Sequence, residues 1–225
     1  MCTAETFKGK RFIYAINHKL IVINQMATEN KLADEVLIFL LKEPFTANIV
    51  TIIANKLDVT RQGLWKSLSK LEKENLIIIK KLAKTRTSTA TISINWSNPI
   101  TEKTLSLFLT KEALKQKRWQ DNFAEIGKHA SFLILFGSIL HGPKEANDID
   151  LLAIVKDRKE FKLIDENVLK IQRTQLKKIH LIDLTEDELF NELKSNNKVY
   201  LEAIQKGVIL FGQDNFIDFM KKFAK

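Results

Sequence analysis

The feature that most constrains the fold lies within residues 136–155, which read FGSILHGPKEANDIDLLAIV. The chain has only 7 glycines, and Gly137 and Gly142 both stand in this stretch. The apolar run before them is short, as expected of a buried central strand. A second apolar run follows directly after Asp148 and Asp150. This order predicts a strand, a glycine turn, and a second strand that opens with two carboxylates.

The acidic pair and the glycine turn together indicate a ligand site. Alternation along a strand places Asp148 and Asp150 on one face while Ile149 points away. Two adjacent carboxylates repel each other unless a cation lies between them, and hard oxygen ligands select Mg²⁺. Gly137 allows close approach of the backbone to a ligand, and the amides of the turn, with the Ser138 hydroxyl, can donate to phosphate oxygens. The alternative is an ordinary glycine turn before a solvated acidic strand start.

The pattern FGSxxxG followed by DIDLL resembles the minimal nucleotidyltransferases of the DNA polymerase beta superfamily. The resemblance extends over roughly residues 131–212, because GVILFG at its end is similar to the strand that often closes these domains. It implies that Gly137 and Ser138 bind the triphosphate of an NTP, and that Asp148 and Asp150 hold Mg²⁺ or Mn²⁺. The implied reaction is transfer of a nucleoside monophosphate to an acceptor hydroxyl.

The sequence departs from this family at the third acidic position. The family usually takes a third carboxylate from a later strand, and residues 177–189 (KKIHLIDLTEDEL) look like that strand and the following helix. His180 occupies the aligned position, and it could ligate a metal or act as a base, so we count it as a candidate catalytic residue. Asp183 is expected on the opposite strand face, as a strand-end or capping residue before Thr185. An active enzyme and a domain that only binds nucleotide both remain possible.

A second order of elements lies in residues 33–95. The expected elements are a helix over 33–42 that ends before Pro44, a helix from a Thr46 cap through Leu57, a third helix after a Thr60 cap, and strands over 76–80 and 89–95. In the third helix Leu64, Leu68 and Leu71 recur at the spacing of one buried face. Asn75 follows, and asparagine tolerates the left-handed conformation that ends helices.

The stretch LDVTRQGLWKSLSKLEKENLI, residues 57–77, resembles the turn, recognition helix and strand start of MarR-like winged helix-turn-helix domains. The resemblance implies contacts with double-stranded DNA. The residues that it assigns to those contacts are Arg61, Gln62 and Lys66 in the major groove, with Lys84 and Arg86 of the wing along the backbone or minor groove. Trp65 could join them or pack internally. The alternative is a three-helix packing module that binds protein.

Charge is divided unevenly along the chain. Residues 1–98 hold 15 Lys and Arg against 8 Asp and Glu, while residues 99–225 hold 21 against 19. Residues 60–88 alone hold 8 basic and 2 acidic residues. A basic surplus favours anionic partners, so this distribution favours a nucleic acid partner for the first half.

These patterns predict an α+β protein with two domains. We expect residues 1–98 to form a winged helix-turn-helix domain with its core at 33–95. Residues 99–130 are expected to form connecting helices, and residues 131–225 a minimal nucleotidyltransferase domain with a small mixed sheet and flanking helices. Asn98 precedes a proline, which disfavours helical backbone there and marks the boundary.

Composition limits location and partners. The single cysteine, Cys2, provides no disulfide framework, as in a reducing cytoplasm. No apolar run approaches the roughly 18 residues that span a bilayer, so we expect a cytoplasmic protein without a membrane partner. The acceptor stays open among a protein hydroxyl, an RNA end and a small molecule. Similar minimal domains act as antitoxins on a HEPN toxin, a homodimer is possible, and the other class of function is a DNA-binding regulator that only senses nucleotide.

Overall fold

The protein is described by a computed structural model that covers residues 31–46, 48–81 and 90–224. It is a mixed α+β structure, as predicted. In these residues no helix combines the length and the apolar character needed to cross a bilayer.

The chain forms two compact units. Among the described residues, the first comprises 31–37, 48–81 and 90–94, and the second comprises 38–46 and 95–224. The observed boundary at Ile94 therefore lies just before the predicted one at residue 98. The assignment of residues 38–46 to the second unit was not predicted, because it depends on contacts far apart in the sequence.

The helices of the first unit follow the predicted pattern in part. Residues 31–42 are helical, of which residues 31–37 belong to this unit, and the later helices are α2 (Val50–Lys56) and α3 (Arg61–Lys73). Asp58 between them has a φ of 51°, which breaks the helix as expected. The Thr60 hydroxyl accepts a hydrogen bond from the Gly63 amide at 3.1 Å, which confirms the predicted cap. The three leucines predicted to form the inner face of α3 are buried.

The predicted start of α2 is wrong. The Thr46 hydroxyl donates to the Glu43 carboxylate, and α2 begins only at Val50. Ile49 is held in extended backbone by a bridge to Thr91, and the Asn48 carbonyl accepts from the Ile92 amide at 2.8 Å. An α2 that began earlier would need these backbone groups for its own hydrogen bonds, so the pairing with Thr91 and Ile92 excludes the earlier start.

The two predicted strands of the first unit are confirmed. They are β1 (Ile77–Lys81) and β2 (Ala90–Ile94), which pair antiparallel with Ile77 opposite Ile94. Asn75 has a φ of 57°, so it adopts the left-handed conformation expected after α3.

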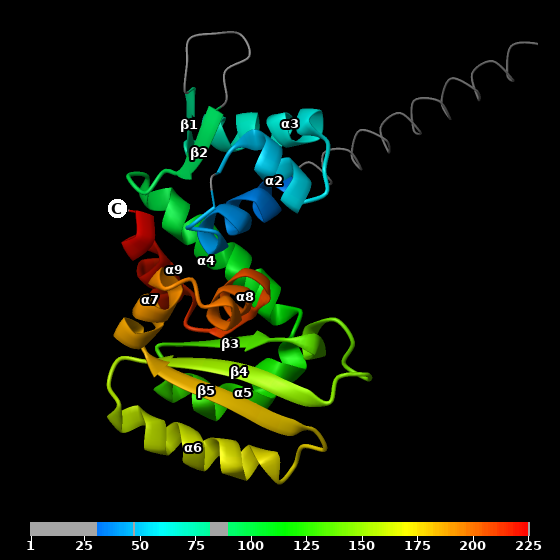
Figure 1. The fold of residues 1–225 in the computed structure, drawn as a ribbon, viewed down its shortest axis with the longest axis vertical. Helices are drawn as coiled ribbons and strands as arrows, with labels where there is room; N and C mark the ends of the chain where they lie inside the picture. Colours follow the sequence, from blue (N-terminus) through cyan, green and yellow to red (C-terminus); the bar gives the residue numbers. More distant parts are fainter. Residues whose placement is uncertain (1–30, 47, 82–89, 225) are drawn as a thin grey trace, which may run out of the picture. The chain divides into compact units, whose positions relative to one another are not determined.

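The second unit is built on a four-stranded mixed sheet in the order β5-β4-β3-β6, of which Figure 1 labels β5, β4 and β3. Its strands are β3 (Phe132–Phe136), β4 (Asp148–Val155), β5 (Lys178–Thr185) and β6 (Val208–Phe211). β3 is antiparallel to β4 and β6, whereas β4 and β5 are parallel. Parallel neighbours need a crossover connection, which α6 (Lys159–Gln172) supplies.

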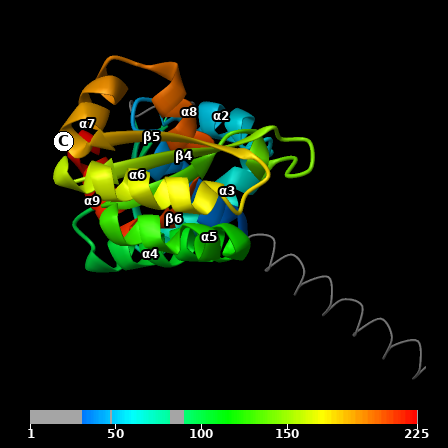
Figure 2. The same cartoon turned by 90° about the horizontal axis from the view of Figure 1, so that it is seen from below.

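Helices cover both faces of this sheet. The elements on one face are α5 (Lys117–His129) and α6, and Figures 1 and 2 show both on the same side. The elements on the other are α7 (Glu186–Lys194), α8 (Lys198–Lys206) and α9 (Gln213–Lys221). On this second face Phe132 of β3 contacts the rings of Phe216 and Phe219 from α9. The central strands are therefore buried, as their apolar runs predicted.

The helices predicted to connect two domains pack within the second unit. α4 (Pro99–Leu114) lies against β6 and α9, and α5 contributes Trp119 and Phe123 to the core. Lys42, which is almost fully buried, bonds to the Glu112 carboxylate at 3.0 Å and to the Gly207 carbonyl at 2.8 Å. A buried ammonium requires such partners, so these bonds tie residues 38–46 to this unit.

Candidate metal centre and nucleic-acid surface

The turn after β3 requires a glycine for two reasons. Gly137 has a φ of 80°, a conformation that side chains disfavour. A Cβ at this position would also lie 2.2 Å from Oδ2 of Asp150, a distance that no real contact has. The single-turn helix at Ser138–Leu140 follows, with the Ser138 side chain exposed. Gly137 and Ser138 are thus brought to the edge of the acidic pair.

β4 presents its two carboxylates on one face. Ile149 is fully buried in the core beneath α5 and α6, so alternation turns Asp148 and Asp150 to the opposite face. Their side chains keep 32% and 26% of their surface exposed. The predicted arrangement is confirmed, and both carboxylates are open to a ligand from solvent.

His180 joins this pair because β5 runs parallel to β4. The register places His180 directly beside Asp150. Its Nδ1 lies 3.2 Å from Oδ2 of Asp148 and 3.6 Å from Oδ1 of Asp150. One ligand atom from each of the three residues lies within 4.8 Å of the other two, so the group could hold a metal ion. His180 lies 30 positions after Asp150 in the sequence, and the sheet register brings the two together.

The acidic pair is electrostatically unfavourable by itself. Burial raises the pKa of Asp150 and the neighbouring charge of Asp148 raises it further, while His180 opposes both effects. Among the described residues no Lys or Arg forms an ion pair with Asp148 or Asp150. A bound divalent cation would supply the missing positive charge.

Asp183 lies away from this cluster. It stands within β5 opposite Ala153, and its pKa is raised by burial and by the charge of Asp165 on α6. Its predicted position on the opposite face is therefore confirmed. Its predicted role as a strand end or cap is wrong, because β5 continues to Thr185. Thr185 itself caps α7 in a reciprocal pair of bonds with Glu188.

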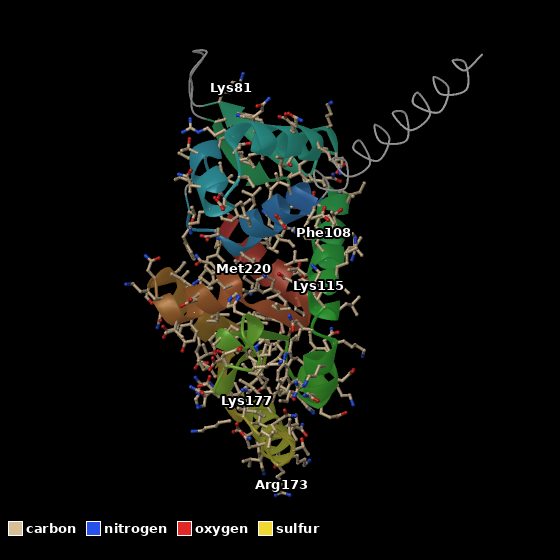
Figure 3. The ribbon with its side chains drawn as sticks, turned by 90° about the vertical axis from the view of Figure 1, so that its right-hand side faces the viewer. Lys81, Phe108, Lys115, Arg173, Lys177 and Met220 are labelled. Atoms are coloured by element: carbon tan, nitrogen blue, oxygen red, sulfur yellow. The ribbon has the colours of Figure 1, made fainter. Side chains whose placement is uncertain are left out.

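Two lysines at the start of β5 were not singled out from the sequence. Lys177, labelled in Figure 3, donates to the carbonyl oxygens of Lys144 and Ala146 and so fastens the loop before Asp148. Lys178 pairs in register with Asp148, and residues paired in register project from the same face. Lys178 is a neighbour of the acidic pair because β5 runs parallel to β4 in this register. No local sequence pattern shows that register, so the sequence alone could not identify Lys178.

The first unit carries the second candidate site. Arg61, Gln62 and Lys66 lie on α3, whose leucines are buried, and all three are exposed. The Trp65 side chain on the same helix is 39% exposed, so it is not a core residue of the described structure. The wing residues of the prediction, Lys84 and Arg86, lie outside the described residues.

Comparisons of the chain with family models, with curated proteins and with solved structures give no match.

Proposed function

We propose that the second unit is a metal-dependent nucleotidyltransferase that transfers a nucleoside monophosphate from an NTP to an acceptor. The observation that carries this proposal is the meeting of Asp148, Asp150 and His180 beside the Gly137 turn, where all three side chains are partly exposed. A ligand-binding turn and a cation site at one strand edge are the two parts that such a reaction needs.

The side chains have distinct roles in this proposal. Asp148 and Asp150 would hold a divalent ion, which supplies Lewis-acid stabilisation of a phosphoryl group when bound. The Ser138 hydroxyl would donate to a phosphate oxygen, and Gly137 leaves room for the triphosphate next to the backbone. His180 would complete the ligand set or take the proton of the acceptor hydroxyl.

The acceptor belongs to one of three classes: a protein hydroxyl, an RNA end or a small molecule. A protein acceptor would include the case of an antitoxin that modifies a HEPN partner. A labelling experiment distinguishes these classes.

The test mixes the purified protein with α-labelled NTPs, Mg²⁺ or Mn²⁺, and a cell extract. The native protein should place label on an acceptor, and Asp148→Asn should not. Asp183→Asn is the matched control, because it removes a half-buried carboxylate from the same sheet but from outside the cluster. Label that persists in Asp148→Asn, or that disappears equally in Asp183→Asn, would refute the proposal.

A second candidate function, DNA binding by the first unit, is favoured by the exposed polar face of α3. Arg61, Gln62 and Lys66 would read or clamp duplex DNA, and the nucleotide site of the other unit would then serve a regulator. Replacing Arg61 and Lys66 by Ala should weaken duplex binding and reduce the salt slope by about 0.9 for each phosphate that the protein no longer neutralises. Lys159→Ala on α6 is the control, and an unchanged slope in the double variant would contradict this function.

A further inference from the structure

We propose that the cluster of Asp148, Asp150 and His180 takes a divalent first-row transition ion, with Mn²⁺ as the probe, in preference to Mg²⁺. This inference rests on the proposed function for what the site does. It adds which class of ion the site accepts.

The chemistry of the donor atoms favours a transition ion. Mg²⁺ binds oxygen ligands in a near-ideal octahedron and gives up its water reluctantly. Asp148 and Asp150 meet that requirement, but the third donor is an imidazole nitrogen. Imidazole suits transition ions such as iron, nickel, copper and zinc, and Mn²⁺ is a first-row transition ion that also suits carboxylates. A set of two carboxylates and one imidazole therefore fits a transition ion better than it fits Mg²⁺.

The positions of the donor atoms suit a shared ion. Ligand atoms about 2.1 Å from one octahedral ion lie about 3 Å apart when they are adjacent. The Nδ1 atom of His180 lies 3.2 Å and 3.6 Å from the nearest oxygens of Asp148 and Asp150. The pairing of Asp150 with His180 is set by the backbone register, so the nitrogen is kept at the cluster by the sheet itself.

The charge of the cluster also disfavours Mg²⁺. A neutral imidazole in place of a carboxylate leaves two negative charges at the site where three carboxylates would give three. Mg²⁺ depends on anionic oxygen ligands and gains little from nitrogen, so it should bind this cluster more weakly than it would bind three carboxylates. A transition ion recovers part of this loss through its bond to the imidazole nitrogen.

The test measures ion binding in the absence of nucleotide. Mn²⁺ is titrated into the protein with electron paramagnetic resonance as the readout, and Mg²⁺ is then added as competitor. Pulsed spectra of the native protein should show coupling of Mn²⁺ to a nitrogen nucleus. His180→Asp should lose this coupling and lower the preference for Mn²⁺ over Mg²⁺ at least about tenfold. His129→Gln, which changes a histidine paired with Glu160 elsewhere in the unit, should keep both.

His180→Gln, checked for folding by circular dichroism, is a second variant that should also lose the nitrogen coupling. Absence of coupling in the native protein, or an unchanged ion preference in a folded His180→Asp protein, would overturn the inference. Nucleotidyl transfer supported by Mg²⁺ without nitrogen coupling would overturn it while leaving the proposed function intact. Nitrogen coupling without any nucleotidyl transfer would support the ion assignment and contradict the proposed function.

Discussion

The two ends of the sheet in the second unit both carry acidic side chains, but the surroundings of these side chains differ. At one end Glu186 accepts from the Ser131 hydroxyl at 2.9 Å and from the Lys222 ammonium at 2.8 Å. Glu160 at the same end bonds to His129 at 2.9 Å. At the other end Asp148 and Asp150 have His180 as their ion-pairing neighbour among the described residues.

The pKa values of Glu186 and Asp150 differ in the same way as the surroundings of these two carboxylates. Burial alone would raise the pKa of Glu186, but the bonds from Lys222 and Ser131, together with the charges of Lys222 and Lys156, outweigh burial and hold the pKa below the ordinary range. Burial and the charge of Asp148 raise the pKa of Asp150. The first end is a structural cluster with paired charges, although a hollow of about 340 Å³ lies beside it. The end with the unbalanced charge is the one that gains most from a cation, so we propose that the functional site lies there.

The largest expected effect comes from removing the acidic pair. The double variant Asp148→Asn with Asp150→Asn should lose metal-dependent NTP binding, and any transfer should fall at least about a hundredfold, because both anionic ligands are gone. Glu186→Gln should keep both properties. Titration of nucleotide with and without metal checks this. Equal nucleotide affinity in the double Asn variant and in Glu186→Gln would show that the two ends of the sheet do not differ in function.

Gly137→Ala should destabilise the second unit by about 1–3 kcal/mol, because the backbone is left-handed there and the new Cβ meets the Asp150 carboxylate. Gly142→Ala is the control, since its Cβ would come close only to the flexible tip of Glu145. Urea unfolding with metal affinity measured in parallel tests this difference. Equal losses of stability in the two variants would mean that the turn has no special conformation.

Glu186→Gln should cost about 1 kcal/mol of unfolding free energy at pH 7, because it weakens the bonds from Lys222 and Ser131. The folded-state pKa of Glu186 lies below its unfolded value, so its ionisation stabilises the protein above the unfolded pKa. This stabilisation is lost as the pH falls through the folded pKa. The difference between native and variant proteins should therefore shrink in acid, and a difference that grows there would contradict the assignment.

The smallest effect should have the opposite sign. Asp150→Asn in metal-free protein should leave the stability at pH 7 unchanged or raise it by a few tenths of a kcal/mol, because it removes repulsion from Asp148. Thermal unfolding in a chelating buffer is the measurement. A loss of stability as large as that of Glu186→Gln would show that Asp150 is a structural residue.

Features fixed by neighbouring residues were predictable from the sequence. The Thr60 cap and the left-handed Asn75 depend on backbone needs within one turn, and the strand around Ile149 depends on simple alternation. These predictions are confirmed because a few adjacent side chains decide each feature.

Features fixed by distant contacts were not predictable in the same way. The extended backbone at Ile49 is held by Thr91, and Lys42 bonds to Gly207, so no local pattern contains either outcome. The candidate metal site was predictable in part. The sequence pattern indicated Asp148, Asp150 and His180, but only the parallel register of β5 places the imidazole beside both carboxylates.

The most direct test of the central claim is a crystal structure of the protein soaked with Mn²⁺, with the ion located by its anomalous scattering. We predict one peak bounded by Asp148, Asp150 and His180, with ligand atoms about 2.1 Å from it. The carboxylate of Glu186 should remain bonded to Ser131 and Lys222. No peak at the cluster, with Nδ1 of His180 still directed at Asp148, would show that the three residues form an ordinary hydrogen-bonded group and would contradict the assignment of a metal centre.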